Sequence, residues 1–404
     1  MRIGELLDRI ESGVSVRSHN QPAGNDQKGV LKVSALSGGR FNPSENKLIR
    51  DDELPRASTN PTPGCTLVSR ANTALLVGES AFVEQSFSQL YLPDKLWQLH
   101  PKRGVVDPYW VSLLLASPQV RAKARVGASG TSGSMKNISQ AAYLSIEVPV
   151  PSLREQQRIA AAARLIESAR QCVDRLIETH QALKRALAKE LLTGRQRFAE
   201  FATQPLKHAL IADVAEVNPP RVLPADLSTK VSFVSMSAIR EDGGCHGLES
   251  RRLGSLGGGY TAFADSDVLV AKITPCFENG KGWLANGLEN GVGLGSTEFH
   301  VIRAGPHVLP QWLYFHSLTH GFRARGQRFM TGSAGQRRVQ AQFIKSYSIP
   351  VPTIGEQTRI ARVFEALEQQ LMLLGQLRDA HDVQKRALMH RLLSGDFTTL
   401  DPAA

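Results

Sequence analysis

An internal repeat constrains the fold of this 404-residue chain more than any single motif does. The segment that begins Val148-Pro-Val-Pro recurs at Ile349-Pro-Val-Pro, and the match runs without a gap to Gly194 and Gly395. The offset is 201 residues, and 18 of 47 positions are identical. Upstream matches are fainter and keep an offset of 202. Because a duplication fixes the architecture before any local assignment, we expect a variable domain and a constant segment, each occurring twice.

The constant segments carry the signals of helix ends. Each opens with Pro-Val-Pro, which favours an extended approach. Ser152 and Thr353 follow as candidate N-caps, with Glu155 and Glu356 three residues later, the spacing of a capping box. Glycine closes each segment, as is common at the C-terminus of a helix. The repeat therefore predicts two long helices.

Apolar residues recur every seven positions in both segments, a pattern typical of helices that pair. A helix of about 40 residues is about 60 Å long, and one small domain cannot bury its apolar stripe. We therefore predict that the two helices pack on each other as an antiparallel coiled coil with pseudo-twofold symmetry. The predicted packing residues are Ile159, Ile166, Val173, Leu176, His180 and Leu187 of the first helix, and Ile360, Leu367, Leu374, Leu377, His381 and Leu388 of the second.

The predicted seam has two positions in each seven-residue repeat. The first is the position of Ile159 and Ile360, and the second lies three residues later. The second position contains Ala162, Ala169, Leu176 and Leu183 in the first helix, and Val363 and Leu377, interrupted by Gln370 and Gln384, in the second. His180 and His381 occupy equivalent seam positions, where a metal site or a proton switch is one interpretation. We favour the other, a polar layer that sets the register of the helices.

Composition narrows the class of partner. The net charge is +11, and the surplus is spread over both halves, which favours an anionic ligand that touches both, such as double-stranded DNA. The four cysteines lack metal-ligand spacing and are expected to be reduced thiols, so we predict neither a metal site nor a cofactor. The charged N-terminus and the lack of a long apolar stretch predict a cytoplasmic protein without a membrane partner.

Basic residues that recur in both halves are the candidate DNA contacts. Three groups arise: a basic helix, the segment that follows a Gly-Thr/Ser loop and precedes the end of the domain, and one matching strand position. In the helices and loops, solvated side chains compete with phosphate contacts, and at the strand position a base contact would need such a donor. The candidates are Arg70, Arg121, Lys123, Arg125 and Lys136 in the first half, and Lys272, Arg323, Arg325, Arg328, Arg337 and Arg338 in the second.

Asn218-Pro-Pro-Arg resembles the Asn-Pro-Pro-aromatic motif of adenine methyltransferases, which would make the chain an enzyme. Arg221 stands where a flipped adenine needs an aromatic ring, and no glycine-rich strand-to-helix turn for the cofactor is evident. We interpret this segment as a loop. A self-sufficient adenine DNA methyltransferase and a coiled-coil interaction scaffold without a DNA role remain the two alternatives.

The repeated architecture resembles the specificity subunits of Type I restriction-modification systems over nearly the whole chain. The repeated helix, with its Glu155-Gln and Arg158-Ile-Ala motifs and its Leu-Leu-Ser/Thr-Gly end, is the specific part, and Leu269-Val-Ala-Lys resembles the usual framework of the target-recognition domains. This resemblance implies that each domain reads one half of a bipartite, asymmetric DNA site through the major groove. It further implies that the helices set the spacing and dock two methyltransferase subunits, and that restriction/translocase subunits join for cleavage. The chain itself is then non-catalytic.

We therefore expect an α/β protein with two target-recognition domains, each followed by a long helix. The expected boundaries are 1–151 for the first target-recognition domain, 152–194 for the first spacer helix, 195–205 for a linker, 206–352 for the second target-recognition domain, 353–395 for the second spacer helix and 396–404 for a tail.

Overall fold

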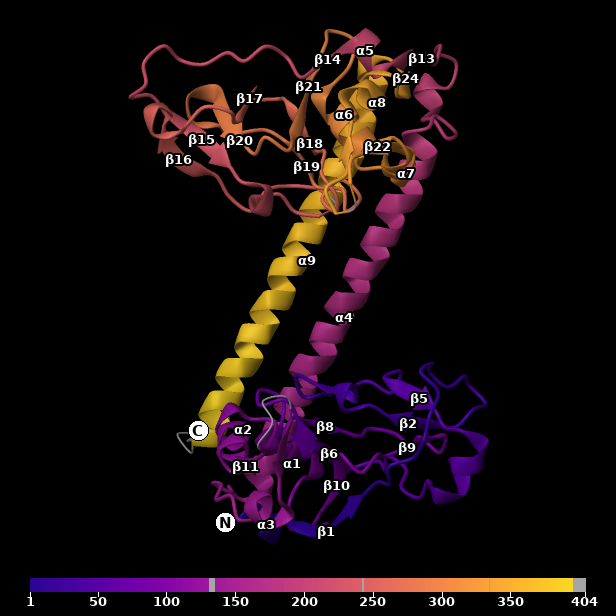
Figure 1. The fold of residues 1–404 in the computed structure, drawn as a ribbon, viewed down its shortest axis with the longest axis vertical. Helices are drawn as coiled ribbons and strands as arrows, with labels where there is room; N and C mark the ends of the chain where they lie inside the picture. Colours follow the sequence, from indigo (N-terminus) through magenta and orange to yellow (C-terminus); the bar gives the residue numbers. More distant parts are fainter. Residues whose placement is uncertain (131–134, 242, 334, 395–404) are drawn as a thin grey trace. The chain divides into compact units, whose positions relative to one another are not determined.

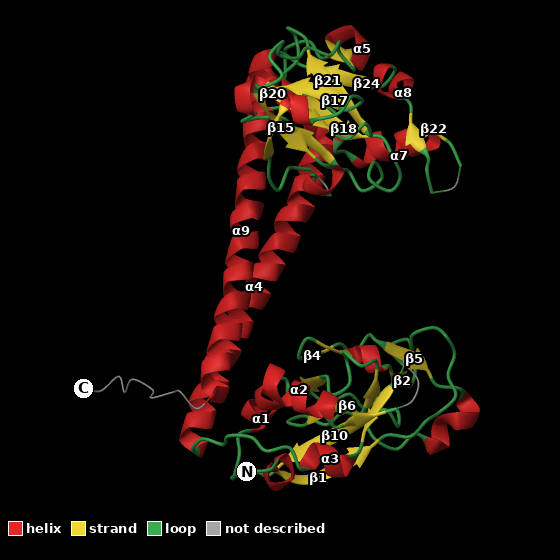
Figure 2. Ribbon diagram, turned by 60° about the vertical axis from the view of Figure 1, so that its left-hand side comes forward, coloured by secondary structure: helices red, strands yellow, loops and turns green. Residues whose placement is uncertain are grey.

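The computed structural model describes residues 1–130, 135–241, 243–333 and 335–394 (Figure 1). The predicted helix stop at Gly395 and the tail 396–404 lie outside the described residues. The chain forms two compact units, Met1–Val173 with Leu377–Ala404, and Asp174–Gln376. In each unit, strands gather into sheets with short helices around them (Figure 2).

The first unit is built on a four-stranded antiparallel sheet with the order β1-β10-β6-β8. A smaller sheet has the order β5-β2-β9, in which β2 runs parallel to β9. A hairpin, β11-β12, continues into a pairing with β7. The strands are β1 (Leu7–Ser12), β2 (Gly29–Leu31), β3 (Leu36–Ser37), β4 (Arg40–Phe41), β5 (Asn46–Leu48), β6 (Thr66–Ser69), β7 (Ala71–Asn72), β8 (Ser80–Phe82), β9 (Leu90–Tyr91), β10 (Leu96–Pro101), β11 (Ala128–Ser129) and β12 (Lys136–Ile138).

Three short helices of this unit are α1 (Pro108–Leu115), α2 (Pro118–Val126) and α3 (Gln140–Leu144). Proline at the first position and a capping side chain before it explain where α1 and α2 begin. The Asp107 carboxylate accepts from the Trp110 N–H at 2.8 Å, and Ser117 caps α2 in the same way. The Trp110 side chain is fully buried, as expected of a core residue.

The second unit repeats this topology. Its main sheet has the order β14-β21-β18-β19, and its smaller sheet, β16-β15-β20-β17, again contains one parallel pair, β15 with β20. The strands are β13 (Lys207–Leu210), β14 (Ala215–Val217), β15 (Lys230–Val234), β16 (Glu249–Arg252), β17 (Thr261–Ala264), β18 (Val268–Ala271), β19 (Gly282–Leu284), β20 (Val292–Gly295), β21 (Phe299–Ala304), β22 (Met330–Thr331), β23 (Arg338–Val339) and β24 (Ser348–Val351). The short helices are α5 (Ile211–Val214), α6 (Pro310–Ser317), α7 (His320–Arg328) and α8 (Ala341–Lys345). The duplication therefore extends through the variable domains.

The two long helices are α4 (Leu153–Leu191) and α9 (Ile354–Ser394). A glutamine near the start of each ties it to the domain before it. Gln156 is buried, accepts from the Asp107 N–H at 2.9 Å and donates to the Pro151 carbonyl at 2.9 Å. Gln357 accepts from the Leu309 N–H at 2.8 Å and donates to the Pro352 carbonyl at 2.8 Å. The repeated Glu-Gln motif thus fixes how each domain joins its helix.

The two predicted capping boxes differ in the structure. Ser152 and Glu155 form the expected reciprocal bonds, 3.1 Å from the Ser152 N–H and 3.3 Å from the Glu155 N–H. The prediction for the second helix is wrong, because Glu356 is buried and forms a bidentate ion pair with Arg197, at 3.0 and 2.6 Å. The segment that follows α4 takes this carboxylate away from the helix N-terminus.

The long helices run antiparallel within each unit, as predicted. In the first unit, Glu167 of α4 pairs with Lys385 of α9 at 2.6 Å, and Arg170 pairs with Asp382 at 2.6 Å, so a later residue of α4 meets an earlier one of α9. In the second unit, Lys184 pairs with Glu368 at 2.8 Å. The Lys184–Glu368 pair is the repeat counterpart of the Lys385–Glu167 pair.

The predicted second seam position needs a correction. Leu176, Leu183 and Leu377 are 42%, 46% and 45% exposed. The position four residues after the first seam position is better buried than the one three residues after it: Ala163 is fully buried and Phe364 nearly so. At the same position, Arg170, Lys184 and Lys385 form ion pairs with the partner helix. Arg170, Ile177, Lys184 and Leu191 continue this line in α4, and Leu371, Arg378 and Lys385 continue it in α9. Hydrophobicity pointed to the wrong position, because long basic side chains cover the seam with their aliphatic stems.

Candidate nucleic-acid interface

Arg70 is held where the central strand β6 ends. Its N–H donates to the Lys95 carbonyl at 3.0 Å, and its carbonyl accepts from the Ile138 N–H at 2.9 Å. The backbone at Arg70 is therefore bonded on both sides, to the segment before β10 and to β12. The Arg70 guanidinium donates to the Asp94 carbonyl at 2.8 Å.

Lys272 occupies the matching place after β18. Its N–H donates to the Glu298 carbonyl at 2.9 Å, and its carbonyl accepts from the Val339 N–H at 2.9 Å. The strand position that was matched by sequence is thus also the same framework position in space. A base-reading or phosphate-binding side chain benefits from such a backbone, because rigid elements hold a site more accurately than loops do.

The second group of candidates lies beside this position in both units. In the first, Lys136 pairs with Asn72 across β12 and β7, and its ammonium donates to the Gly130 carbonyl at 2.8 Å. In the second, the carbonyl of Arg337 accepts from the Thr274 N–H at 2.9 Å, and the Arg337 side chain donates to the Gln327 carbonyl at 3.1 Å.

The basic helices α2 and α7 approach the same place with one face. Arg121 forms an ion pair with the buried Glu79, and Arg125 donates to the Leu75 carbonyl at 2.6 Å. In the second unit, Arg323 donates to the Glu278 carbonyl at 3.4 Å, and Arg328 is exposed. Each unit therefore has a basic corner. We define it as Arg70, Lys95, Arg121, Arg125 and Lys136 in the first unit, and as Lys272, Arg323, Arg328, Arg337 and Arg338 in the second.

The other face of these helices contacts the end of its domain instead. Lys123 donates to the Glu147 carbonyl at 2.7 Å. The Arg325 guanidinium lies 5.9 Å from the centre of the Tyr347 ring. Residues two positions apart on a helix point in different directions, which separates Lys123 and Arg325 from the basic corners.

Each corner contains one arginine that is paired with an acid, Arg121 with Glu79 and Arg338 with Glu298, but the two acids stand at different framework positions. In the second unit, Arg338 forms a bidentate ion pair with Glu298, with a shortest distance of 2.8 Å. The hydrogen bond from Arg338 lowers the pKa of the Glu298 carboxyl below its usual value. The position that corresponds to Glu298 in the first unit is Lys95, which adds a positive charge. Sequence reasoning missed Lys95, because its place became visible only through the pairing of its carbonyl with Arg70.

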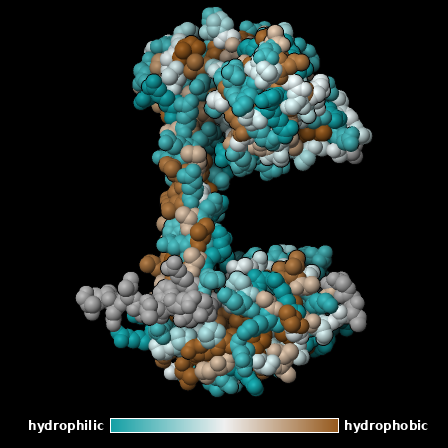
Figure 3. Space-filling view, turned by 90° about the vertical axis from the view of Figure 1, so that its left-hand side faces the viewer, coloured by the Kyte–Doolittle hydropathy of each residue, from teal (hydrophilic) through white to brown (hydrophobic). Residues whose placement is uncertain are grey.

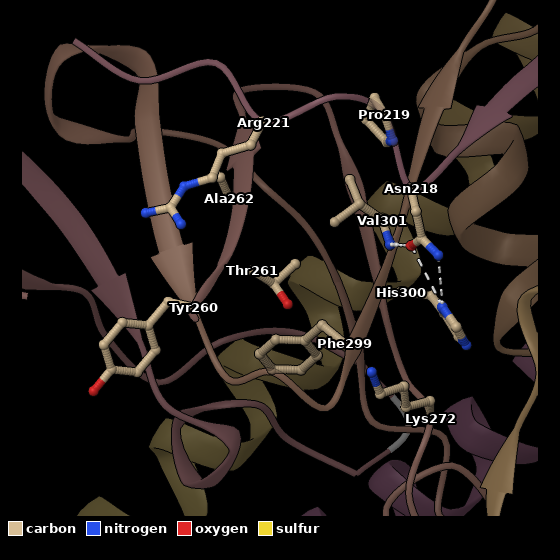
Figure 4. Close-up of a pocket in the computed structure, with 10 residues that line it drawn as sticks. All are labelled: Asn218, Pro219, Arg221, Tyr260, Thr261, Ala262, Lys272, Phe299, His300 and Val301. Carbon is tan, nitrogen blue, oxygen red and sulfur yellow. Dashed lines mark hydrogen bonds between the residues drawn. The ribbon is translucent and has the colours of Figure 1, made fainter. Parts of the chain in front are cut away.

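Sequence reasoning also missed a pocket beside Lys272 (Figure 4). Its volume is about 290 Å³. The lining residues are Asn218, Pro219, Arg221, Tyr260, Thr261, Ala262, Lys272, Phe299, His300 and Val301.

The Asn-Pro-Pro segment forms part of this pocket and has a structural use. The Asn218 side-chain oxygen accepts from the Val301 N–H at 3.0 Å, and its amide donates to Nδ1 of His300 at 3.1 Å. The backbone at Asn218 has a φ of 56°, a left-handed conformation that asparagine tolerates well. Both functional ends of the amide that a methyltransferase would direct at adenine are therefore engaged within the domain.

Within the described residues, no group of His, Cys, Asp and Glu side chains is arranged to hold a metal ion. None of the described helices combines the length and the apolarity that a membrane span requires.

Comparison with known proteins identifies the architecture. Residues 290–380 match the family model described as the Type I restriction modification DNA specificity domain. The chain is 37% identical over 212 residues to the Type I restriction enzyme EcoEI specificity subunit of Escherichia coli, and 36% identical over 208 residues to the EcoAI specificity subunit of the same organism. These alignments cover 47% and 46% of this chain, and the chain spans 35% of the length of each of these curated relatives.

The fold has a solved counterpart. The structure of a Type I restriction-modification system S subunit from M. genitalium superposes with a TM-score of 0.61 at 13% identity, over 97% of this chain and 95% of that one. At this identity the likeness concerns the fold. The comparisons therefore show a Type I restriction modification DNA specificity domain at residues 290–380, similarity of about half of this chain to the two specificity subunits, and a fold shared with the S subunit.

Proposed function

We propose that this chain is the DNA-reading subunit of a Type I restriction-modification complex and recognises a bipartite, asymmetric site in double-stranded DNA. The observation that supports this most is the basic corner, which occurs at the same framework position in two domains of the same topology. One corner per domain is what a protein needs if it reads two half-sites.

The basic corners suggest that different residues position the protein on the DNA and read its bases. Among the described residues, Arg70 and Lys136 donate to backbone carbonyls. Their charge therefore stays available for DNA phosphates, which set the register of the protein on the duplex. Base edges are then read by side chains of the surrounding loops. Because Lys95 in one unit stands where Glu298 stands in the other, the two half-sites read by the units should differ.

The long helices offer surfaces for partner subunits. Leu165 of α4 is 72% exposed, and Leu373 and Val383 of α9 are 52% and 56% exposed. Hydrophobic residues are visible as brown patches along the helices in Figure 3. Contiguous exposed apolar patches mark protein contacts, whereas single exposed apolar residues are common on any surface. We propose that two methyltransferase subunits dock here, that restriction/translocase subunits join the complex for cleavage, and that the assembly works in the cytoplasm.

We propose further that the chain is non-catalytic and that methyl transfer belongs to the partner subunits. The engagement of the Asn218 amide by Val301 and His300 supports this against the adenine methyltransferase alternative. The other alternative, an interaction scaffold without a DNA role, predicts that the chain assembles with its partners equally well with and without DNA.

The experiment is a methyl-transfer assay with labelled S-adenosylmethionine and genomic DNA. The full-length chain, the methyltransferase subunits, and the mixture of both are assayed in parallel. We expect label in DNA only with the mixture. Methyl transfer by this chain alone would support the enzyme alternative, and transfer by the methyltransferase subunits alone would remove the need for a specificity subunit.

A further inference from the structure

The pocket beside Lys272 has a rigid floor. Phe299 and His300 are 2% and 6% exposed. Nε2 of His300 donates to the Val339 carbonyl at 3.0 Å, so Nδ1 is the nitrogen that accepts from the Asn218 amide. Burial lowers the pKa of the His300 imidazole below its ordinary value, which agrees with a neutral ring bonded at both nitrogens. The floor therefore has no free polar group of its own.

The rim of the pocket carries the charge. The ammonium of Lys272 points into the space beside the Phe299 ring, and Thr261 stands between it and the far side (Figure 4). Arg221 and Tyr260 lie on that far side, and the Arg221 guanidinium points away from Lys272. The ten lining residues include two cations and no carboxylate. Glu298, the acidic neighbour of Lys272, is already bound by both nitrogens of the Arg338 fork. The pocket is thus positive and lacks a built-in counter-ion.

We propose that this pocket binds one backbone phosphate of the DNA and so sets the register of the second domain on the duplex. A phosphodiester group is a small anion with accessible oxygens, and ammonium, guanidinium and hydroxyl groups are its usual protein partners. The backbone of Lys272 is bonded on both sides, which gives the phosphate a fixed place relative to the sheet. This inference rests on the proposed DNA-reading function and adds the chemistry of one contact.

The test uses the full-length chain assembled with its methyltransferase subunits and a short duplex that contains its methylated site. Binding is measured at several salt concentrations for the wild type, Lys272→Gln and Arg221→Gln. One lost phosphate contact makes the slope of log K against log salt less steep by about 0.9. We expect about this change for Lys272→Gln, and a smaller change for Arg221→Gln, because the Arg221 guanidinium points away from Lys272 (Figure 4). Lys272→Arg should retain the wild-type slope.

The matched control is Lys207→Gln, an exposed lysine of β13 in the same unit that does not line the pocket; its slope should equal that of the wild type. A second arm replaces single phosphates of the duplex with uncharged methylphosphonates. We expect one position whose replacement weakens binding to the wild type and not to Lys272→Gln.

Three results would overturn the inference. An unchanged slope for Lys272→Gln is one, and an altered base preference at an unchanged slope, which indicates a base contact, is another. The third is a methylphosphonate scan that is the same for the wild type and Lys272→Gln, which would leave the pocket at most a site for free phosphate. Failure of the wild-type complex to prefer its site would instead refute the proposed function, so the two failures are distinguishable.

Discussion

The same framework position holds different chemistry in the two units. In the first, Cys65, just before β6, lies 3.2 Å from Nδ1 of His100, and Nε2 of His100 lies 2.8 Å from the Glu11 carboxylate. In the second, the corresponding residues are Asp267 and Arg303, which form a bidentate ion pair at 2.8 and 2.7 Å. The duplicated backbone is therefore preserved without its side-chain contacts, as expected if two domains share a scaffold and have diverged in what they bind.

The starts of α4 and α9 also differ in their side-chain contacts. We expect the largest loss of stability from a substitution here. Glu356, at the start of α9, is the ion-pair partner of the largely buried Arg197, and breaking a buried ion pair costs about 4 kcal/mol, the loss expected for Glu356→Ala. The matched variant Glu155→Ala removes only part of an exposed capping box and should cost about 1 kcal/mol. Urea unfolding of both variants measures the difference, and equal losses would mean that the two helix starts are equivalent after all.

Substitutions in the basic helices α2 and α7 should distinguish arginines that stabilise the fold from arginines that bind DNA. Arg121→Ala leaves the buried carboxylate of Glu79 without its cation and should destabilise the protein by about 3 kcal/mol. Arg328→Ala removes an exposed cation and should change stability by less than about 0.5 kcal/mol, while it weakens DNA binding. Thermal unfolding combined with a DNA-binding assay tests this. A fully stable Arg121→Ala protein would contradict the structural role of this arginine.

The buried glutamines are the part of the molecule in which the two units agree. Gln156→Ala and Gln357→Ala each leave a partly buried backbone N–H, of Asp107 or Leu309, without its side-chain acceptor. We expect each to lose about 2 kcal/mol, with the two losses equal to within about 0.5 kcal/mol. Denaturant unfolding of the two variants is the measurement, and a loss confined to one of them would show that only one domain depends on this anchor.

The smallest effect on stability is expected for substitution of Glu11. Burial alone would raise the pKa of its carboxyl, but hydrogen bonds from Arg9, Gln98 and His100 lower it to about 2. A lowered pKa in the folded state gives stability that is present above the ordinary value of 4.5 and is lost as the pH falls toward 2. Glu11→Gln should therefore be less stable than the wild type at pH 6, and the gap should narrow between pH 4.5 and pH 2. A constant gap over this range, in urea titrations at each pH, would show that the carboxylate is not stabilised by these bonds.

Much of the architecture followed from the repeat, because helix caps, heptads and a constant offset are local signals. The antiparallel pairing followed as well, since two long apolar stripes have to be buried. The seam position was misplaced because Arg170 and Lys184 looked too polar for an interface, although each reaches an acid on α9. The role of Glu356 could not be predicted, because Arg197 is 159 residues away in sequence and meets it only in the fold.

The candidate DNA contacts were predictable as groups and not as a site. Recurrence in both halves selected Arg70 and Lys272, and the structure places them at equivalent bonded positions. Sequence could not show that Lys123 and Arg325 contact other parts of their domains. The pocket was beyond sequence reasoning as well, because its walls come from four separate segments of the chain.

Methylome sequencing of cells that express this chain with its methyltransferase subunits tests the central claim most directly. Two unlike readers on a repeated scaffold predict a single methylated motif with two different halves separated by unspecified bases. A continuous motif, two identical half-sites, or the same motif in cells without this chain would contradict the account.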